Sequence, residues 1–105
     1  MAKYLITYSG GAQPDGMSEA ETATIMAAWQ AWYQRLGEAL VDFGNPTGAS
    51  KVVVPGGVVS DGAPGITGYS LLNADSLDAA AEACRKHPHL DAGGSITIHE
   101  TFDVG

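Results

Sequence analysis

Positive charge is scarce in this sequence. Only 5 lysine and arginine residues stand against 12 aspartate and glutamate residues, so the formal net charge is −7. A protein that binds nucleic acid neutralises phosphates with a basic surface, and docking on anionic lipid has the same requirement. We therefore expect a partner that is neither a nucleic acid nor a membrane.

Cysteine and long apolar runs are scarce as well. The one cysteine, Cys84, excludes an intramolecular disulfide and a thiolate metal cluster, and its position on the inner face of an expected helix predicts a buried, inert thiol. No segment approaches the ~20 apolar residues of a membrane-spanning helix. The apolar run at residues 3–9 is too short for the core of a signal peptide. We expect a cytoplasmic protein.

What the sequence does contain is the hydrophobic periodicity of one domain, residues 1–105. Strands are expected at 3–9, 51–54, 68–74 and 95–102, and the second of them has a possible beginning at 40–43. A long helix is expected at 18–40, opened by a capping box of Ser18 and Glu21 and weakened or capped at Gly37. A second helix is expected at 77–85 and ends before Pro88.

The order β-α-β-β-α-β predicts an α+β fold of the ferredoxin-like kind, an antiparallel sheet with both helices on one face. Strand 3–9 carries apolar residues on both faces, so the second face of the sheet also needs a cover. We expect a homodimer that pairs two such open sheet faces. The glycine-rich stretch 41–68 fits either a flexible hairpin beside a ligand cleft or an edge of the sheet.

Several features together resemble the YCII-related family, also called DGPF-domain proteins. They are Asp61-Gly62 ahead of Gly68-Tyr69, the run Ala74-Asp75-Ser76-Leu77-Asp78-Ala79-Ala80, Pro88 after the helix, and Gly93-Gly94-Ser95 entering the last strand. The opening KYLITYSG and the tryptophan-bearing helix fit too, so the resemblance covers nearly the whole chain. It implies a ferredoxin-like homodimer with a barrel-like core and a cleft. Asp61-Gly62-Ala63-Pro64 stands where the family has Asp-Gly-Pro-Phe.

The three histidines are the candidates for acid-base catalysis near neutral pH. His99 lies mid-strand beside threonines, and it fits either a general base oriented by Asp61 or Asp42, or a strand histidine with a structural partner. His87 and His89 flank Pro88, where a surface loop is expected rather than a metal site. No metal and no organic cofactor are expected.

Three aromatic residues are candidates for binding a small molecule. Tyr8 and Tyr69 could offer hydroxyl groups to a small acid or phenol. Trp32 lies three residues after Trp29, and this pair fits either the wall of an aromatic pocket or a core packed on the sheet.

Two functional hypotheses of different classes follow. The first is a homodimer that binds a small aromatic or acidic molecule and acts on it by acid-base chemistry through His99 and Asp61, as a lyase or isomerase without cofactor. The second is a non-catalytic dimeric module, either a ligand sensor or an accessory subunit. A cofactor-free monooxygenase is a third hypothesis, suggested by the tryptophans and the fold alone.

Overall fold

A computed structural model describes residues 2–11, 18–62 and 65–104. β1 (Ala2–Ser9) is followed by α1 (Glu19–Leu36), the 3-10 helix η1 (Gly37–Ala39) and β2 (Leu40–Asp42). Next come β3 (Lys51–Val53), β4 (Val59–Asp61), β5 (Gly68–Ala74), α2 (Leu77–Cys84), α3 (Pro88–Asp91) and β6 (Ser95–Glu100). Ala63 and Pro64 of the Asp61-Gly62-Ala63-Pro64 segment lie outside the described residues.

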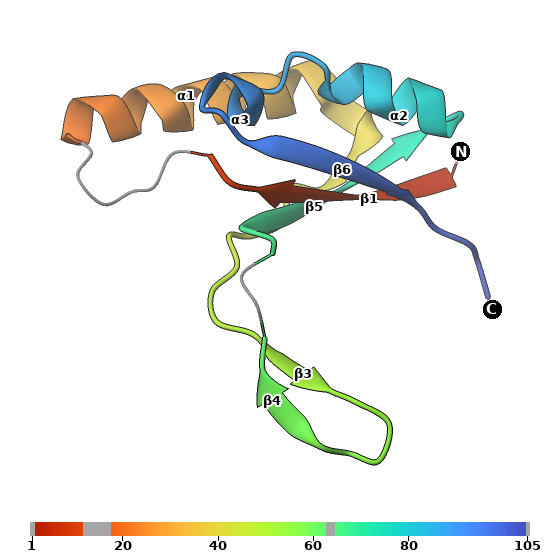
Figure 1. Cartoon of the computed structure of the whole chain (residues 1–105). Coiled ribbons are helices and arrows are strands. Elements are labelled where there is room, and N and C mark those ends of the chain that lie inside the picture. The colour runs from red at the N-terminus through yellow and green to blue at the C-terminus, as the bar shows by residue number, and fades with distance from the viewer. Residues whose placement is uncertain (1, 12–17, 63–64, 105) are drawn as a thin grey trace.

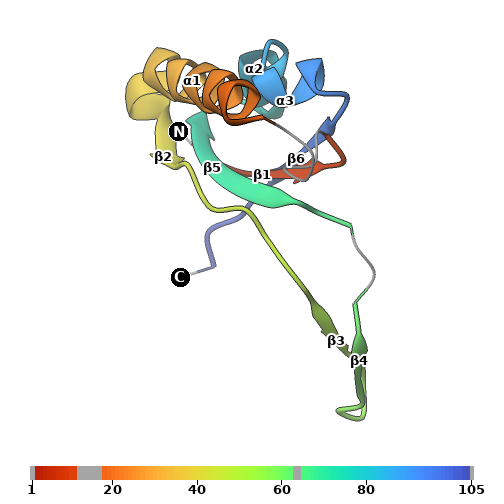
Figure 2. The ribbon, with the colours of Figure 1, turned by 90° about the vertical axis from the view of Figure 1, so that its left-hand side faces the viewer.

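Four strands form an antiparallel sheet in the order β2-β5-β1-β6, and the three α-helices lie over the same face of it (Figures 1 and 2). This α+β architecture is compatible with the ferredoxin-like fold that the sequence predicts. None of the helices in the described part of the chain combines the length and apolar character that a membrane crossing requires.

Residue alternation along β1 decides which side chains enter the core. Tyr4, Ile6 and Tyr8 are buried under the helices, because every second residue of a strand points to the same face. The remaining buried apolar residues come from the helices and from β5: Trp32, Leu72, Ala80 and Cys84. Burial of Cys84 confirms the inert thiol that the sequence predicts.

The long helix α1 begins as its sequence indicates. The Ser18 hydroxyl accepts a hydrogen bond from the Glu21 amide at 3.1 Å, and it donates one to the Glu21 carboxylate at 3.2 Å. At the other end Gly37 adopts a positive φ of 55°, and its amide donates to the carbonyl of Tyr33. The α-helix therefore stops at Leu36, and one 3-10 turn leads into the sheet.

The prediction that residues 51–54 form the second strand of this sheet was wrong, although the possible beginning at 40–43 overlaps β2. Residues 51–54 do not join the four-stranded sheet; β2 does, and Leu40 lies opposite Leu72 of β5. β3 instead pairs only with β4, in a separate hairpin that projects away from the sheet on the side without helices (Figure 1). The valine run at 51–54 has the higher β propensity. β2 nevertheless takes the position beside β5, because it directly follows the helix in the chain and consecutive elements tend to be neighbours in space.

The face of the sheet opposite the helices has no cover in the described chain. Its central residues come from three strands: Leu5, Thr7, Tyr69, Leu71, Thr97 and His99. Leu5 and Leu71 are opposite each other and remain partly exposed. An apolar pair at the centre of an uncovered sheet face is the feature that the sequence predicts for a subunit contact.

Candidate functional site: an aromatic cleft

A cleft of about 730 Å³ lies between α1 and the adjoining ends of β1 and β5. Ligand pockets commonly measure about 300–1,000 Å³, so this cleft has room for a small organic molecule. Five aromatic side chains line it: Tyr8, Trp29, Tyr33, Phe43 and Tyr69. Among the described residues, no lysine, arginine, aspartate or glutamate lines the cleft.

Four of these rings pack against one another, two of the pairs edge to face and the third tilted, and these contacts fix the wall that they form. Tyr8 and Trp29 have ring centroids 5.0 Å apart at an interplanar angle of 67°. Tyr33 lies 6.1 Å from Trp29 and 5.4 Å from Phe43. Such contacts add about 0.5–1.5 kcal/mol per pair beyond area burial, so the wall is preorganised rather than assembled by a ligand.

Tyr8 is fixed by a chain of buried hydrogen bonds. The Ser70 hydroxyl donates to the Phe43 carbonyl at 2.7 Å, so its oxygen must accept from the Tyr8 hydroxyl, which is 2.8 Å away. Burial raises the pKa of Tyr8 well above its ordinary value, despite the opposing effect of the Ser70 hydrogen bond. Tyr8 is therefore a neutral phenol, suited to packing against a ligand rather than to removing a proton.

His87 is packed behind this wall. It is 0% exposed, and its ring centroid lies 4.1 Å from that of Trp32 and 4.4 Å from that of Trp29. Its Nδ1 accepts a hydrogen bond from the His89 amide at 2.9 Å, so the proton of the neutral ring is on Nε2. Burial, and secondarily the neighbouring His89, lowers the pKa of His87 to about 3.

The Nε2 of His87 has no hydrogen-bond partner among the described residues. The surrounding tryptophan rings provide weak acceptors in their π systems. Protonation of this ring would place a charge among aromatic carbons, so His87 stays neutral and takes the place of a core aromatic residue.

His89 reaches the cleft itself. Its Nε2 lies 2.9 Å from the carbonyl of Ser9, so Nε2 carries the proton and Nδ1 is the basic atom of the neutral ring. The backbone leaves space for the imidazole at Gly94, where a Cβ atom would overlap the ring. Gly11 does the same on the other side and has a positive φ of 91°.

The expectation of a surface loop at His87 and His89 was wrong. Pro88 opens the short helix α3, with His87 as its N-cap, and this turn directs both imidazoles under α1. A proline at the first position of a helix is a known start signal, so His87-Pro88 could have indicated α3. No three His, Cys, Asp or Glu side chains lie together as metal ligands would within residues 2–11, 18–62 and 65–104.

Tyr8 and Tyr69, both predicted as ligand-binding residues, come together at the cleft, although from different sides. Tyr8 lies on the helix face of the sheet. Tyr69 pairs with Thr7, so it lies on the opposite face and contributes the rim beside Gly44. The cleft therefore has lining residues from both faces of the sheet.

Trp32, the third predicted ligand residue, does not line this cleft. It is 2% exposed, and its indole Nε1 donates to the carbonyl of Ala83 at 3.2 Å. Trp29, whose role the sequence leaves open, is the tryptophan of the cleft wall.

His99 and Asp61 lie on different surfaces of the chain. His99 is exposed on the open face, and its Nε2 is 3.3 Å from the hydroxyl of Thr7. Asp61 is exposed on β4 and pairs with Lys51. Asp42, the alternative orienting group, accepts a hydrogen bond from the Gly44 amide at 2.8 Å. A single chain therefore does not assemble the predicted acid-base pair.

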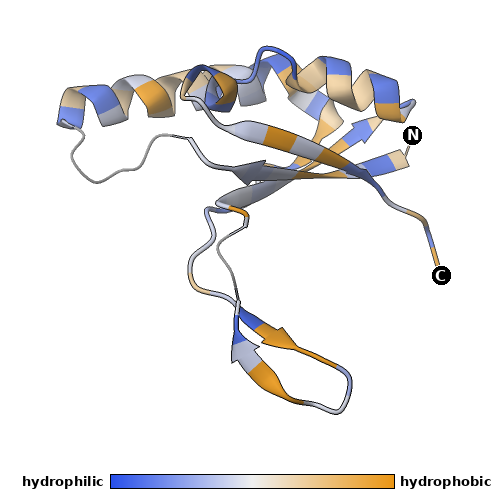
Figure 3. Cartoon of the chain, viewed as in Figure 1, coloured by the Kyte–Doolittle hydropathy of each residue, from blue (hydrophilic) through white to orange (hydrophobic). Residues whose placement is uncertain are grey.

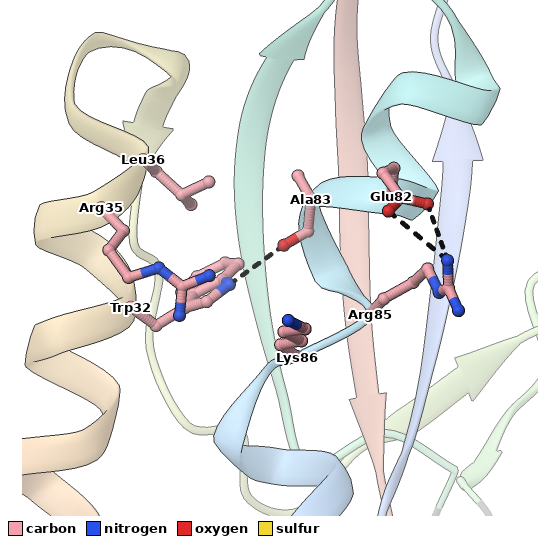
Figure 4. A pocket seen from close by; sticks show the side chains of 7 residues that line it. All are labelled: Trp32, Arg35, Leu36, Glu82, Ala83, Arg85 and Lys86. Carbon is pink, nitrogen blue, oxygen red and sulfur yellow. Dashed lines mark hydrogen bonds and ion pairs between the residues drawn. The ribbon is translucent and has the colours of Figure 1, made fainter.

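A second cavity, of about 600 Å³, lies between the C-terminal ends of α1 and α2 (Figure 4). Arg35, Arg85 and Lys86 line it, and Arg85 is paired with Glu82. Positive side chains stabilise the negative ends of helix dipoles, which accounts for this cluster without a ligand. The aromatic cleft is consequently the better candidate site.

No protein-family model matches this chain, and no curated protein matches it.

Proposed function

We propose that this protein binds a small, neutral aromatic molecule in the cleft between α1 and the sheet. The observation that carries the proposal is the lining itself, five aromatic side chains with no lysine, arginine, aspartate or glutamate among the described residues. Aromatic rings bind a planar apolar ligand by stacking and edge contacts. A carboxylate in the same place would lose its hydration without meeting a lysine or arginine side chain.

Polar groups at the rim give the ligand an orientation. Gln30, Asn45, Thr47 and Thr67 line the cleft and offer amide and hydroxyl groups. A phenol or a similar alcohol could place its ring against Trp29 and its hydroxyl at this rim. Of the two ligand classes expected from the sequence, aromatic and acidic, the lining favours the aromatic one.

We further propose that the functional unit is a YCII-like homodimer joined through the open face. The proposal is supported by the strand order β2-β5-β1-β6, with β1 paired to both β5 and β6, and by the partly exposed Leu5 and Leu71. It also draws on the resemblance of residues 58–100 to the YCII-related family.

Catalysis is a second candidate function, favoured by the exposed imidazole of His99 beside Thr7. Because Asp61 pairs with Lys51 on a separate hairpin, His99 could meet Asp61 only where two copies adjoin. Turnover that survives His99→Ala would exclude this role and leave a ligand-binding module.

Calorimetric titration with 2-naphthol and 2-naphthoate tests the proposed ligand class. The two compounds share a ring system and differ in charge at pH 7. The proposal predicts that 2-naphthol binds at least about tenfold more tightly, because only the anion has to be desolvated without a counter-charge. Equal affinities, or tighter binding of the anion, would contradict it.

A further inference from the structure

The hairpin of residues 51–61, which we call the arm, is held away from the sheet by backbone pairing. The ladder begins where Tyr69 donates to Asn45 at 3.3 Å, and it continues where Thr47 donates to Thr67 at 3.0 Å. Gly62 then donates to the Ser50 carbonyl at 3.0 Å, next to the pair of Lys51 and Asp61. The arm therefore extends the pairing of β2 and β5, which gives it a defined direction (Figure 2).

Both faces of the arm carry exposed valine side chains. Val53 and Val59 are opposite each other on one face and are 67% and 58% exposed. Strand alternation puts the other valines, Val52, Val54 and Val58, on the second face, and these are 42–65% exposed. Figure 3 shows hydrophobic stretches in both strands of the arm. These valines have no cover within the described chain.

The overall dimensions of the chain agree with an arm that makes few contacts with the rest of the molecule. The Cα radius of gyration is 15.4 Å, whereas a compact chain of this length has about 13 Å. A two-stranded hairpin is at best marginally stable in water by itself. An exposed apolar ribbon also invites association with other chains.

We propose that the arm docks on the open face of a second copy of this chain. The described residues include two apolar surfaces that face the same side of the chain without a cover, the arm and the pair Leu5 and Leu71 at the centre of the open face. The arm points away from its own sheet, so these two surfaces meet between copies rather than within one (Figures 1 and 2). In a two-fold symmetric dimer, the arm of each copy lies on the open face of the other, so the same contact is made twice.

This inference rests on the proposed homodimer and adds the arm to its interface. It places Asp61 of one copy and His99 of the other at the same subunit contact, since Asp61 ends β4 and His99 belongs to the open face. The dimer can therefore bring together the acid-base pair, Asp61 and His99, that a single chain keeps apart.

An isotope-filtered NOE experiment tests the contact directly. One copy is labelled with ¹³C at its valine methyl groups and mixed with an unlabelled copy. We expect intermolecular NOEs from the arm valines to Leu5 and Leu71. A dimer without NOEs from the arm would overturn the arm contact and leave the homodimer intact, whereas a monomer at NMR concentration would overturn both.

A matched pair of variants gives the energetic test. The double variant Val53→Thr and Val59→Thr keeps the side-chain shape and the β-branched character of the hairpin but adds hydroxyls to its apolar face. We expect its dimer dissociation constant, measured by sedimentation, to rise at least about tenfold. Val104→Thr makes the same change at a residue that is 99% exposed outside the arm, and should dissociate as the parent does. Equal dissociation of the double variant and the parent would refute the proposal.

Discussion

Lowering the pH from 7 to 5 should destabilise this protein through His87. The imidazole is fully buried, and its pKa falls from 6.5 to about 3 on folding. Below pH 6.5 the unfolded chain binds a proton at this residue that the folded chain does not bind. Stability is therefore complete above pH 6.5 and is lost as the pH falls toward 3.

The size of the effect follows from the shift. Each pH unit within this window costs about 1.4 kcal/mol, so the loss is about 2 kcal/mol at pH 5 and reaches on the order of 4–5 kcal/mol near pH 3. The groups packed against His87 are the rings of Tyr8, Trp29, Trp32 and His89. None of these rings carries a negative charge near neutral pH that would stabilise the imidazolium.

Urea denaturation at pH 7, 6 and 5 measures this dependence, above the range in which most carboxylates titrate. His87→Asn keeps an N-cap acceptor for the His89 amide and removes the titrating group. We expect the variant to be less stable at pH 7, because ring contacts are lost, but to lose about 2 kcal/mol less on acidification to pH 5. Ala27→Asn, at an exposed position of α1 outside the cleft, is the matched control and should keep the parent slope. An unchanged slope in His87→Asn would refute the assignment.

Two further predictions concern the cleft. Gly94→Ala should lower stability by about 1–3 kcal/mol in urea denaturation, because its methyl group overlaps the His89 ring, whereas Gly48→Ala has open space around it and should be nearly neutral; equal effects would contradict the packing of His89. Met26→Arg adds a cation to the cleft wall and should shift the preference from 2-naphthol toward 2-naphthoate by about tenfold in calorimetry. Ala27→Arg, on the same helix but outside the cleft, should leave that preference unchanged, and a similar shift in both variants would argue for a general charge effect.

The elements with strong periodicity could be predicted from the sequence. β1, α1, β5, α2 and β6 follow alternation or helical spacing, and local signals such as Ser18 and Gly37 mark the ends of α1. These features depend on interactions within a few residues, which a pattern of side chains records directly.

The position of β2 and the burial of His87 could not be predicted in this way. β2 has three residues, and its place in the sheet depends on pairing with β5, about 30 residues further along the chain. His87 is buried because α3 turns it under the tryptophans of α1, and composition alone makes a His-Pro-His segment look like a loop.

The two tryptophans show the same limit at the site. Residues three apart differ by about 60° around a helix, so Trp29 and Trp32 share one apolar stripe. Helix α2 decides between them, because its Ala83 carbonyl accepts from Trp32 and leaves Trp29 to the cleft. The sequence could therefore predict an aromatic wall but not which tryptophan forms it.

The most direct test of the account is the location of a bound neutral aromatic compound. Intermolecular NOEs should be recorded between unlabelled 2-naphthol and the ¹³C-labelled protein. We predict NOEs from the naphthol protons to Trp29, Tyr33 and Met26, which line the cleft. NOEs confined to the arm valines or the open face, with none to Trp29 and Tyr33, would contradict the assignment of the cleft as the binding site.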